Sequence, residues 1–165
     1  MSIGQTTVVE SIAETLYLRL TPMVNNTIYN TKVREVIRPR RLEDRTIKDR
    51  QIVMTDASHD RVPELDHEGN PPAQAWRITF NLYLHVQNDE SKCEPIDKVI
   101  HTFAADVKKA VCAVDSRWHT FGDKAIDATW QSMEAIQADG SFDGVNLPIS
   151  ITYRVSENDP YQVRS

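Results

Sequence analysis

The chain contains little glycine and little cysteine, and each scarcity excludes a class of protein. Among 165 residues there are five glycines and two cysteines. The glycine-rich motifs that bind nucleotide phosphates, G-x-G-x-x-G and G-x-x-x-x-G-K-[ST], are absent. Cys93 and Cys112 form no C-x-x-C pair. The sequence therefore indicates neither a disulfide framework nor a zinc knuckle, and we expect two reduced thiols.

Long apolar segments and common catalytic motifs are also missing. No run of 18 apolar residues is present, and the first 20 residues lack the basic segment and apolar core of a signal peptide. We therefore expect no membrane span and a protein kept in a cytosol-like compartment. The motifs G-x-S-x-G and H-E-x-x-H do not occur. The sequence thus predicts a protein that is not an enzyme and uses no cofactor.

One polar stretch contains residues of the types that bind metal ions. It supplies imidazoles and carboxylates from Asp56, His59, Asp60, Asp66, His67 and Glu68. Their spacing matches no known metal-binding loop, and polar loops commonly carry such residues. The sequence therefore predicts no metal site.

Two segments have the apolar period of an amphipathic helix. The first, residues 8–20, follows the T-x-x-E capping box of Thr7 and Glu10 and ends before Pro22. The second spans residues 95–114, where apolar residues form a single stripe behind an initial proline.

Residues 76–87, WRITFNLYLHVQ, alternate between apolar and polar side chains. Because a strand projects successive side chains to opposite faces, this pattern predicts a strand with one dry and one wet face. The wet face carries Arg77, Thr79, Asn81, Tyr83 and His85, and we expect it at a subunit contact or in solvent. Weaker patterns predict further strands at 27–40, 50–56, 126–137 and 147–155. Asp139-Gly140 and Asp143-Gly144 indicate hairpin turns before the last of these.

The segment between the second and third predicted strands differs in composition. Residues 57–75, ASHDRVPELDHEGNPPAQA, contain three prolines, many charges and no apolar period. The sequence predicts a long polar loop there. We expect a single domain over residues 1–165 with an α+β fold. Its mostly antiparallel β-sheet would have two amphipathic helices packed on one face.

Charge is distributed unevenly along the chain. The net charge is -5, yet residues 32–50 contain eight basic and four acidic residues. This asymmetry suits contact with nucleic acid or with an acidic protein surface. A charged segment whose arginines pair with nearby carboxylates explains it equally well. No aromatic residues are interleaved with these cations, which argues against binding of single-stranded nucleic acid.

The closing segment, LPISITYRVSENDPYQ, resembles the C-terminal strand of tail-terminator and neck proteins of tailed bacteriophages. The features in common are Tyr-Arg in an apolar-alternating strand and a following Asn/Asp-Pro turn, here Tyr153, Arg154, Asn158, Asp159 and Pro160. The order of the upstream elements is similar too: an amphipathic helix, a proline-interrupted β region, a Trp-led strand, a second helix and a Trp-containing strand.

The resemblance implies a virion structural protein without catalytic activity. Tail terminators are similar to small α+β subunits that form a hexameric ring on the tail tube, stop its growth and present a surface to the head connector. Expected partners are thus further copies of the chain, the tail tube protein and a head-connector or head-closure protein, with DNA only passing through the lumen. On this reading Arg34, Arg38, Arg40 and Arg41 would meet acidic protein surface. The alternatives are a head-closure or other neck protein, and a nucleic-acid-binding module that uses residues 32–50.

Overall fold

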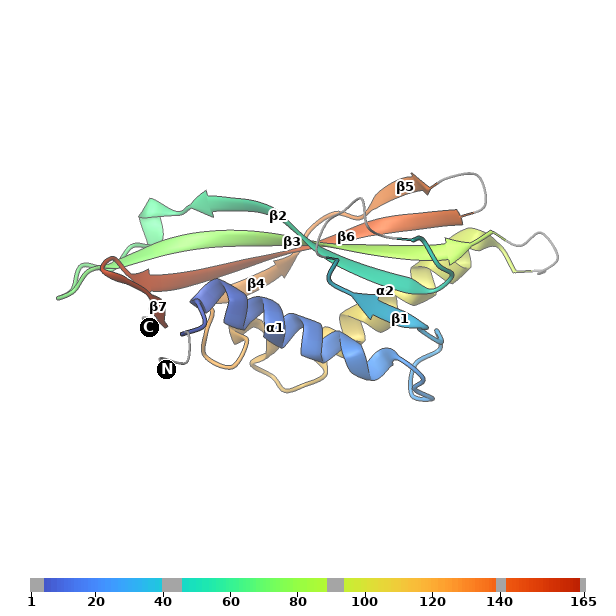
Figure 1. Ribbon diagram of the computed structural model, residues 1–165, viewed down its shortest axis with the longest axis horizontal. Helices are drawn as coiled ribbons and strands as arrows, with labels where there is room; N and C mark the ends of the chain where they lie inside the picture. Colours follow the sequence, from blue (N-terminus) through green and yellow to red (C-terminus); the bar gives the residue numbers. More distant parts are fainter. Residues whose placement is uncertain (1–4, 40–45, 89–93, 139–141, 164–165) are drawn as a thin grey trace.

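The computed structural model describes residues 5–39, 46–88, 94–138 and 142–163, which form an α+β fold. Its seven-stranded sheet is mixed but mostly antiparallel, and two α-helices accompany it (Figure 1). The helices are α1 (Val8–Leu20) and α2 (Ile96–Cys112). The strands are β1 (Glu35–Ile37), β2 (Gln51–Arg61), β3 (Ala73–Gln87), β4 (Asp127–Trp130), β5 (Glu134–Ala138), β6 (Phe142–Ser156) and β7 (Asp159–Val163).

Both predicted helices are confirmed. At the start of α1 the Thr7 hydroxyl accepts a hydrogen bond from the Glu10 backbone N–H at 3.2 Å, which satisfies one of the free donors of the first turn. Pro22 lies in the short 3₁₀ turn that follows α1. The second helix, α2, begins directly after Pro95 and ends two residues before the predicted boundary.

The long strands β3 and β6 form the centre of the sheet. They pair antiparallel over 15 residues, from Ala73 opposite Ser156 to Gln87 opposite Phe142. The strand order is β1-β2-β3-β6-β4, and β5 and β7 pair with other parts of β6. The β1–β2 pair is parallel, which is the departure from a purely antiparallel sheet.

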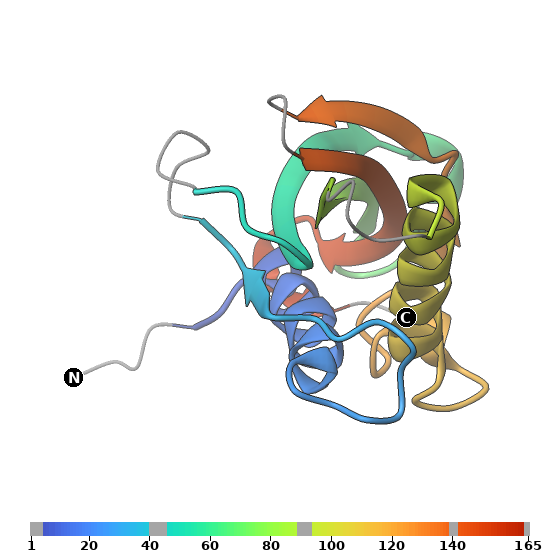
Figure 2. The same ribbon diagram turned by 90° about the vertical axis from the view of Figure 1, so that its right-hand side faces the viewer.

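The dry face predicted for residues 76–87 is confirmed. Ile78, Phe80, Leu82 and Leu84 of β3 are fully buried, and the odd-numbered apolar residues of β6 join the same core. That core also contains side chains of both helices, which lie next to each other in Figures 1 and 2. Each fully buried side chain of this size stabilises the fold by about 1.5–3 kcal/mol relative to its exposed state.

The loop predicted at residues 57–75 is shorter than expected, because its first five and last three residues belong to strands. Strand β2 continues to Arg61 and β3 begins at Ala73, so that residues 62–72 alone connect them. The outer half of β2 pairs with β3 only, since β1 pairs only with Gln51–Val53. Most side chains of residues 55–61 are exposed, and none is buried. Main-chain hydrogen bonds to β3 hold this half of β2, and such bonds do not require apolar side chains. This half of the strand therefore has no dry face and shows no apolar alternation in the sequence.

The strand predicted at 126–137 is confirmed as β structure, but it is divided into β4 and β5. Gln131 N–H donates to the Pro148 carbonyl at 2.9 Å, so the backbone of Pro148 faces this side of β6. Proline has no N–H to donate to a neighbouring strand. The interruption at residues 131–133 therefore lies where β6 cannot complete the hydrogen-bond ladder.

Two further expectations differ from the structure, and one further strand was not predicted. The strand predicted at 27–40 is reduced to β1, because residues 24–34 form an irregular loop. Asp143-Gly144 is not a turn but lies within β6, which begins at Phe142, whereas Gly140 lies outside the described residues. The closing polar segment contains β7, which folds back against β6 after a turn at Glu157–Asn158.

The connection between β2 and β3 is held by a carboxylate whose titration can be tested. Asp66 accepts hydrogen bonds from Arg61 at 2.6 and 2.8 Å and from the Ala75 N–H at 2.8 Å. These donors, Arg61 first, lower the pKa of Asp66 from 3.8 to about 2.

We predict that NMR titration of the wild-type protein will find this low pKa, and that Arg61→Gln will raise it toward the ordinary value. The stability contributed by the carboxylate is fully present above pH 3.8 and is lost as the pH falls toward 2. A pKa near 3.8 in the wild-type protein would contradict the observed pairing.

Candidate protein-interaction surface

Arg38, one of the four predicted contact residues, lies against α1. Its guanidinium donates to both carboxylate oxygens of Glu10, at 2.9 and 3.2 Å, and lies 3.7 Å from Glu14. This hydrogen bonding lowers the pKa of Glu10, and the pKa of Arg38 is raised in turn. Arg38 thus has an intramolecular partner, and its side chain is only 30% exposed.

This pair changes the expected result of a charge reversal at Arg38. We predict that Arg38→Gln lowers the free energy of unfolding by about 0.5–1 kcal/mol, because the paired side chains are partly solvated. Arg38→Glu should cost more, since it places a carboxylate beside Glu10 and Glu14. Urea denaturation at pH 7 measures both changes, with Lys32→Gln as the matched control at an exposed cation of the same segment. Equal midpoints for Arg38→Gln and wild type would show that the pair adds no stability.

Arg34 is placed differently. Its side chain is 71% exposed, and its nearest described carboxylate is the buried Asp49, at 3.8 Å. Asp49 also accepts from the Gln87 N–H at 2.9 Å and lies 3.9 Å from Arg50. The Arg34 guanidinium is therefore available to another molecule. Arg40 and Arg41 lie outside the described residues.

The other described lysines of the basic segment also differ in whether they pair within the chain. Lys48 pairs with Glu35 at 3.2 Å, whereas Lys32 is exposed on the loop that precedes β1. Intramolecular pairing thus accounts for part of the charge of residues 32–50. Lys32 and Arg34 are the described cations of this segment that extend most freely into solvent.

The wet face of β3 is a hydrogen-bonded polar surface. Thr79 and Ser150 share a hydrogen bond of 2.8 Å, and the Asn146 amide donates to Asn81 at 3.1 Å. His85, which the alternation places on the wet face, is only 1% exposed and is therefore buried within the subunit. Most of the polar side chains of this face already bond to one another across the strands.

A groove that the sequence did not predict lies at the opposite end of the sheet, beside the start of α1. It has a volume of about 520 Å³, and its lining includes Val9, Trp76, Tyr153, Val155 and Pro160. Trp76 and Tyr153 are directly paired across β3 and β6. Burial raises the pKa of Tyr153 to about 12.

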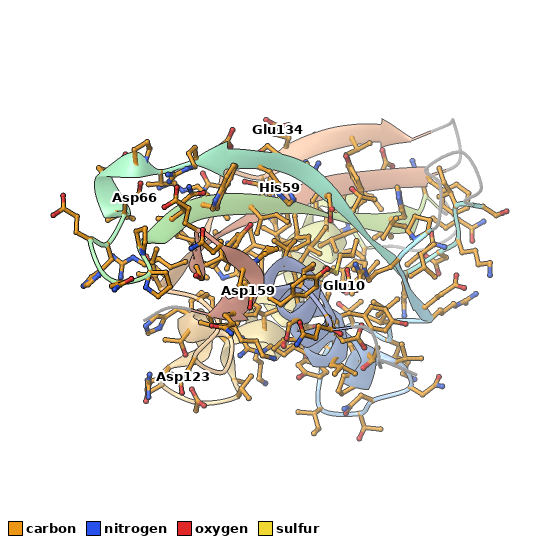
Figure 3. The ribbon with its side chains drawn as sticks, turned by 60° about the vertical axis from the view of Figure 1, so that its left-hand side comes forward. Glu10, His59, Asp66, Asp123, Glu134 and Asp159 are labelled. Carbon is orange, nitrogen blue, oxygen red and sulfur yellow. The ribbon has the colours of Figure 1, made fainter. Side chains whose placement is uncertain are left out.

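The groove exists because the dry face of the sheet extends past the N-terminal end of α1. Figure 3 brings this end of the molecule forward, with His59 on β2 and Asp159 at the start of β7. Glu157 contributes a carboxylate to the groove, and His59 and Thr7 complete part of its polar lining. The arrangement offers an apolar recess with an acidic margin.

The described residues contain no group of three or more His, Cys, Asp or Glu side chains that could hold a metal ion. Asp66, one of the residues considered from the sequence, is engaged by Arg61. Neither described helix is long and apolar enough to cross a membrane.

Comparison with known proteins adds no family assignment. The chain matches no protein-family model, and no curated protein matches it.

Proposed function

We propose that this chain is a virion structural protein of a tailed bacteriophage, a tail terminator that caps the tail tube as a hexameric ring and forms part of the head–tail junction. The observation that carries the proposal is the order of the elements. A capped helix precedes the β region, Trp76 lies in β3, α2 follows, and β4 contains Trp130. The chain then closes with Tyr153-Arg154 in β6 and the turn into β7. This is the order on which the resemblance to tail terminators rests.

The placement of the helices supports the same proposal. In Figure 1 helix α1 lies below the sheet, and α2 passes behind the right-hand part of the strands. The wet face of β3 and β6 carries hydroxyl and amide side chains. On our proposal the helices pack on one face only, and the second face remains available to neighbours in the ring or to solvent. Such a protein acts by shape and contact, without catalysis or a cofactor, and it would be assembled in the host cytoplasm and remain in the virion.

The pairing of the basic segment favours this reading over a nucleic-acid-binding module. The cations that pair with Glu10 and Glu35 within the same chain are less available to phosphates. Retention on heparin at moderate salt would favour nucleic-acid binding instead. A head-closure or other neck protein is the alternative within the virion.

Electron microscopy tests the proposal. The purified chain is mixed with the tail tube protein encoded in the same phage genome and imaged by negative stain. We expect closed rings at one end of tubes whose growth has stopped. Monomers or open fibres in the presence of tube subunits would overturn the proposal, and rings that bind the head connector but not the tube would favour the head-closure alternative.

A further inference from the structure

An exposed apolar side chain lies at the end of the molecule opposite the groove. Ile28, in the loop that follows α1, is 70% exposed, the largest exposed fraction among the described large apolar residues. Its loop has a defined shape. The Asn26 side chain accepts from the Ile28 N–H at 2.8 Å and donates to the Pro22 carbonyl at 2.9 Å. The loop therefore presents Ile28 to solvent from a hydrogen-bonded turn.

The same loop is fixed to the body of the protein after Ile28. Tyr29 packs against the core beneath Lys109, whose ammonium lies 5.7 Å from the ring centroid. The Thr31 N–H donates to the buried carboxylate of Asp106 at 2.7 Å. An isoleucine held outward in this way loses little conformational freedom when it is buried by another molecule.

The groove and Ile28 lie beyond opposite ends of α1. Thr7 and Val9, which line the groove, are at the start of this helix, whereas Ile28 follows its end (Figure 1). A helix of 13 residues is about 20 Å long. Ile28 cannot reach the groove of its own chain, so any contact between these two surfaces joins different molecules.

Charge is complementary between the two surfaces. Lys32 and the 71% exposed Arg34 follow Ile28 along the loop, and no acidic residue occurs between residues 24 and 34. At the groove Glu157 is exposed and Asp159 lies beside it. Opposite charges at the margin of a contact favour the correct partner and orientation.

We infer that Ile28 of one copy inserts into the groove of the next copy, against Trp76 and Tyr153, with Lys32 and Arg34 facing Glu157 and Asp159. The occupant of the groove is thus a second copy of this chain. The two surfaces are different, so the contact is head-to-tail and repeats from copy to copy until it closes into a ring. This inference rests on the proposed function, since it assigns the contact that would build the terminator ring.

Directed disulfide formation tests the contact. Cys93 and Cys112 are replaced by serine, and Ile28→Cys and Pro160→Cys are introduced separately and together. We expect neither single variant to cross-link, an equal mixture to form dimers, and the double variant to form a ladder that ends in a closed species. Dimers of the Ile28→Cys variant alone would indicate a symmetric contact and overturn the inference. Absence of cross-links in both the mixture and the double variant, at protein concentrations where wild-type rings form on tubes, would also overturn it.

Substitutions in the intact protein provide a second test. Ile28→Asp should lower the association constant between copies about tenfold or more, because it places a carboxylate in an apolar recess. Val114→Asp is the matched control, since Val114 is also an exposed aliphatic residue, at 56%, but follows α2. Equal effects of the two substitutions in sedimentation experiments would contradict the inference.

A charge exchange separates this contact from the ring itself. Arg34→Glu and Glu157→Lys should each weaken association, and a mixture of the two variants should restore part of it at the contacts where the new charges meet. Rings that cap tubes but are insensitive to all of these substitutions would remove this contact and leave the proposed function standing. Cross-linked rings that never bind tubes would support this contact and overturn the proposed function.

Discussion

Replacing Phe103 with alanine is expected to lower the free energy of unfolding by about 3–5 kcal/mol. Phe103 lies in α2 and is fully buried in the core that also contains β3 and β6 residues. Alanine removes most of its buried surface and leaves a cavity that the surrounding strands cannot fill without moving. For a domain whose total stability is about 5–15 kcal/mol, this is a large fraction.

Urea denaturation followed by tryptophan fluorescence measures this loss. Phe103→Leu is the control, because it retains most of the apolar volume and should cost less than about 2 kcal/mol. If Phe103→Ala costs no more than Phe103→Leu, α2 does not depend on this side chain for its attachment to the sheet.

Gly144→Ala is expected to destabilise the protein by about 1–3 kcal/mol, since it forces an added methyl group into a filled space. Gly144 pairs with His85 between the two longest strands. A Cβ atom at residue 144 would lie 2.6 Å from the Leu84 carbonyl oxygen. That oxygen belongs to the backbone of a central strand, so it cannot move aside as a flexible side chain can.

Gly69→Ala is the matched control for this prediction. A Cβ atom there would lie no closer than 3.4 Å to its neighbours, and its nearest neighbour is the side chain of His67. We expect a change within about 0.5 kcal/mol. Equal unfolding midpoints for the two variants would show that the strands separate at Gly144 without appreciable cost.

The sequence predicts the elements whose side chains divide between core and solvent. Strand β3 and helix α2 each bury one face, so their apolar periods of 2 and 3.6 residues are visible in the sequence. The outer half of β2 and strand β7 are held by backbone pairing at the margins of the sheet and bury no side chain of their own there. Strands of this kind leave no apolar period, and for this reason residues 57–61 and 159–163 were not predicted as strands.

The candidate surface was less predictable than the fold, because it depends on residues that are distant in the sequence. The basic character of residues 32–50 is evident, but the pairing of Arg38 with Glu10 appears only when β1 is placed beside α1. The groove requires Val9, Trp76 and Tyr153 to converge from three separate elements. The exposed Ile28 is an isolated apolar residue in a polar segment, a signal that the sequence contains but that periodicity does not detect.

The pairing of β3 with β6 also determines the order of events on the ribosome. Gln87 pairs with Phe142, and Ala73 pairs with Ser156, so the central strand waits for some 55 to 83 further residues before its partner is synthesised. At about 5–20 residues per second, the wait lasts several seconds. During this interval β2 can pair with one edge of β3, and its apolar face must be covered by α1, α2 and other segments that precede β6, without the β6 side chains of the finished core. We therefore expect nascent chains that end before residue 142 to bind chaperones and to aggregate when chaperones are depleted, whereas chains that extend past residue 156 should not.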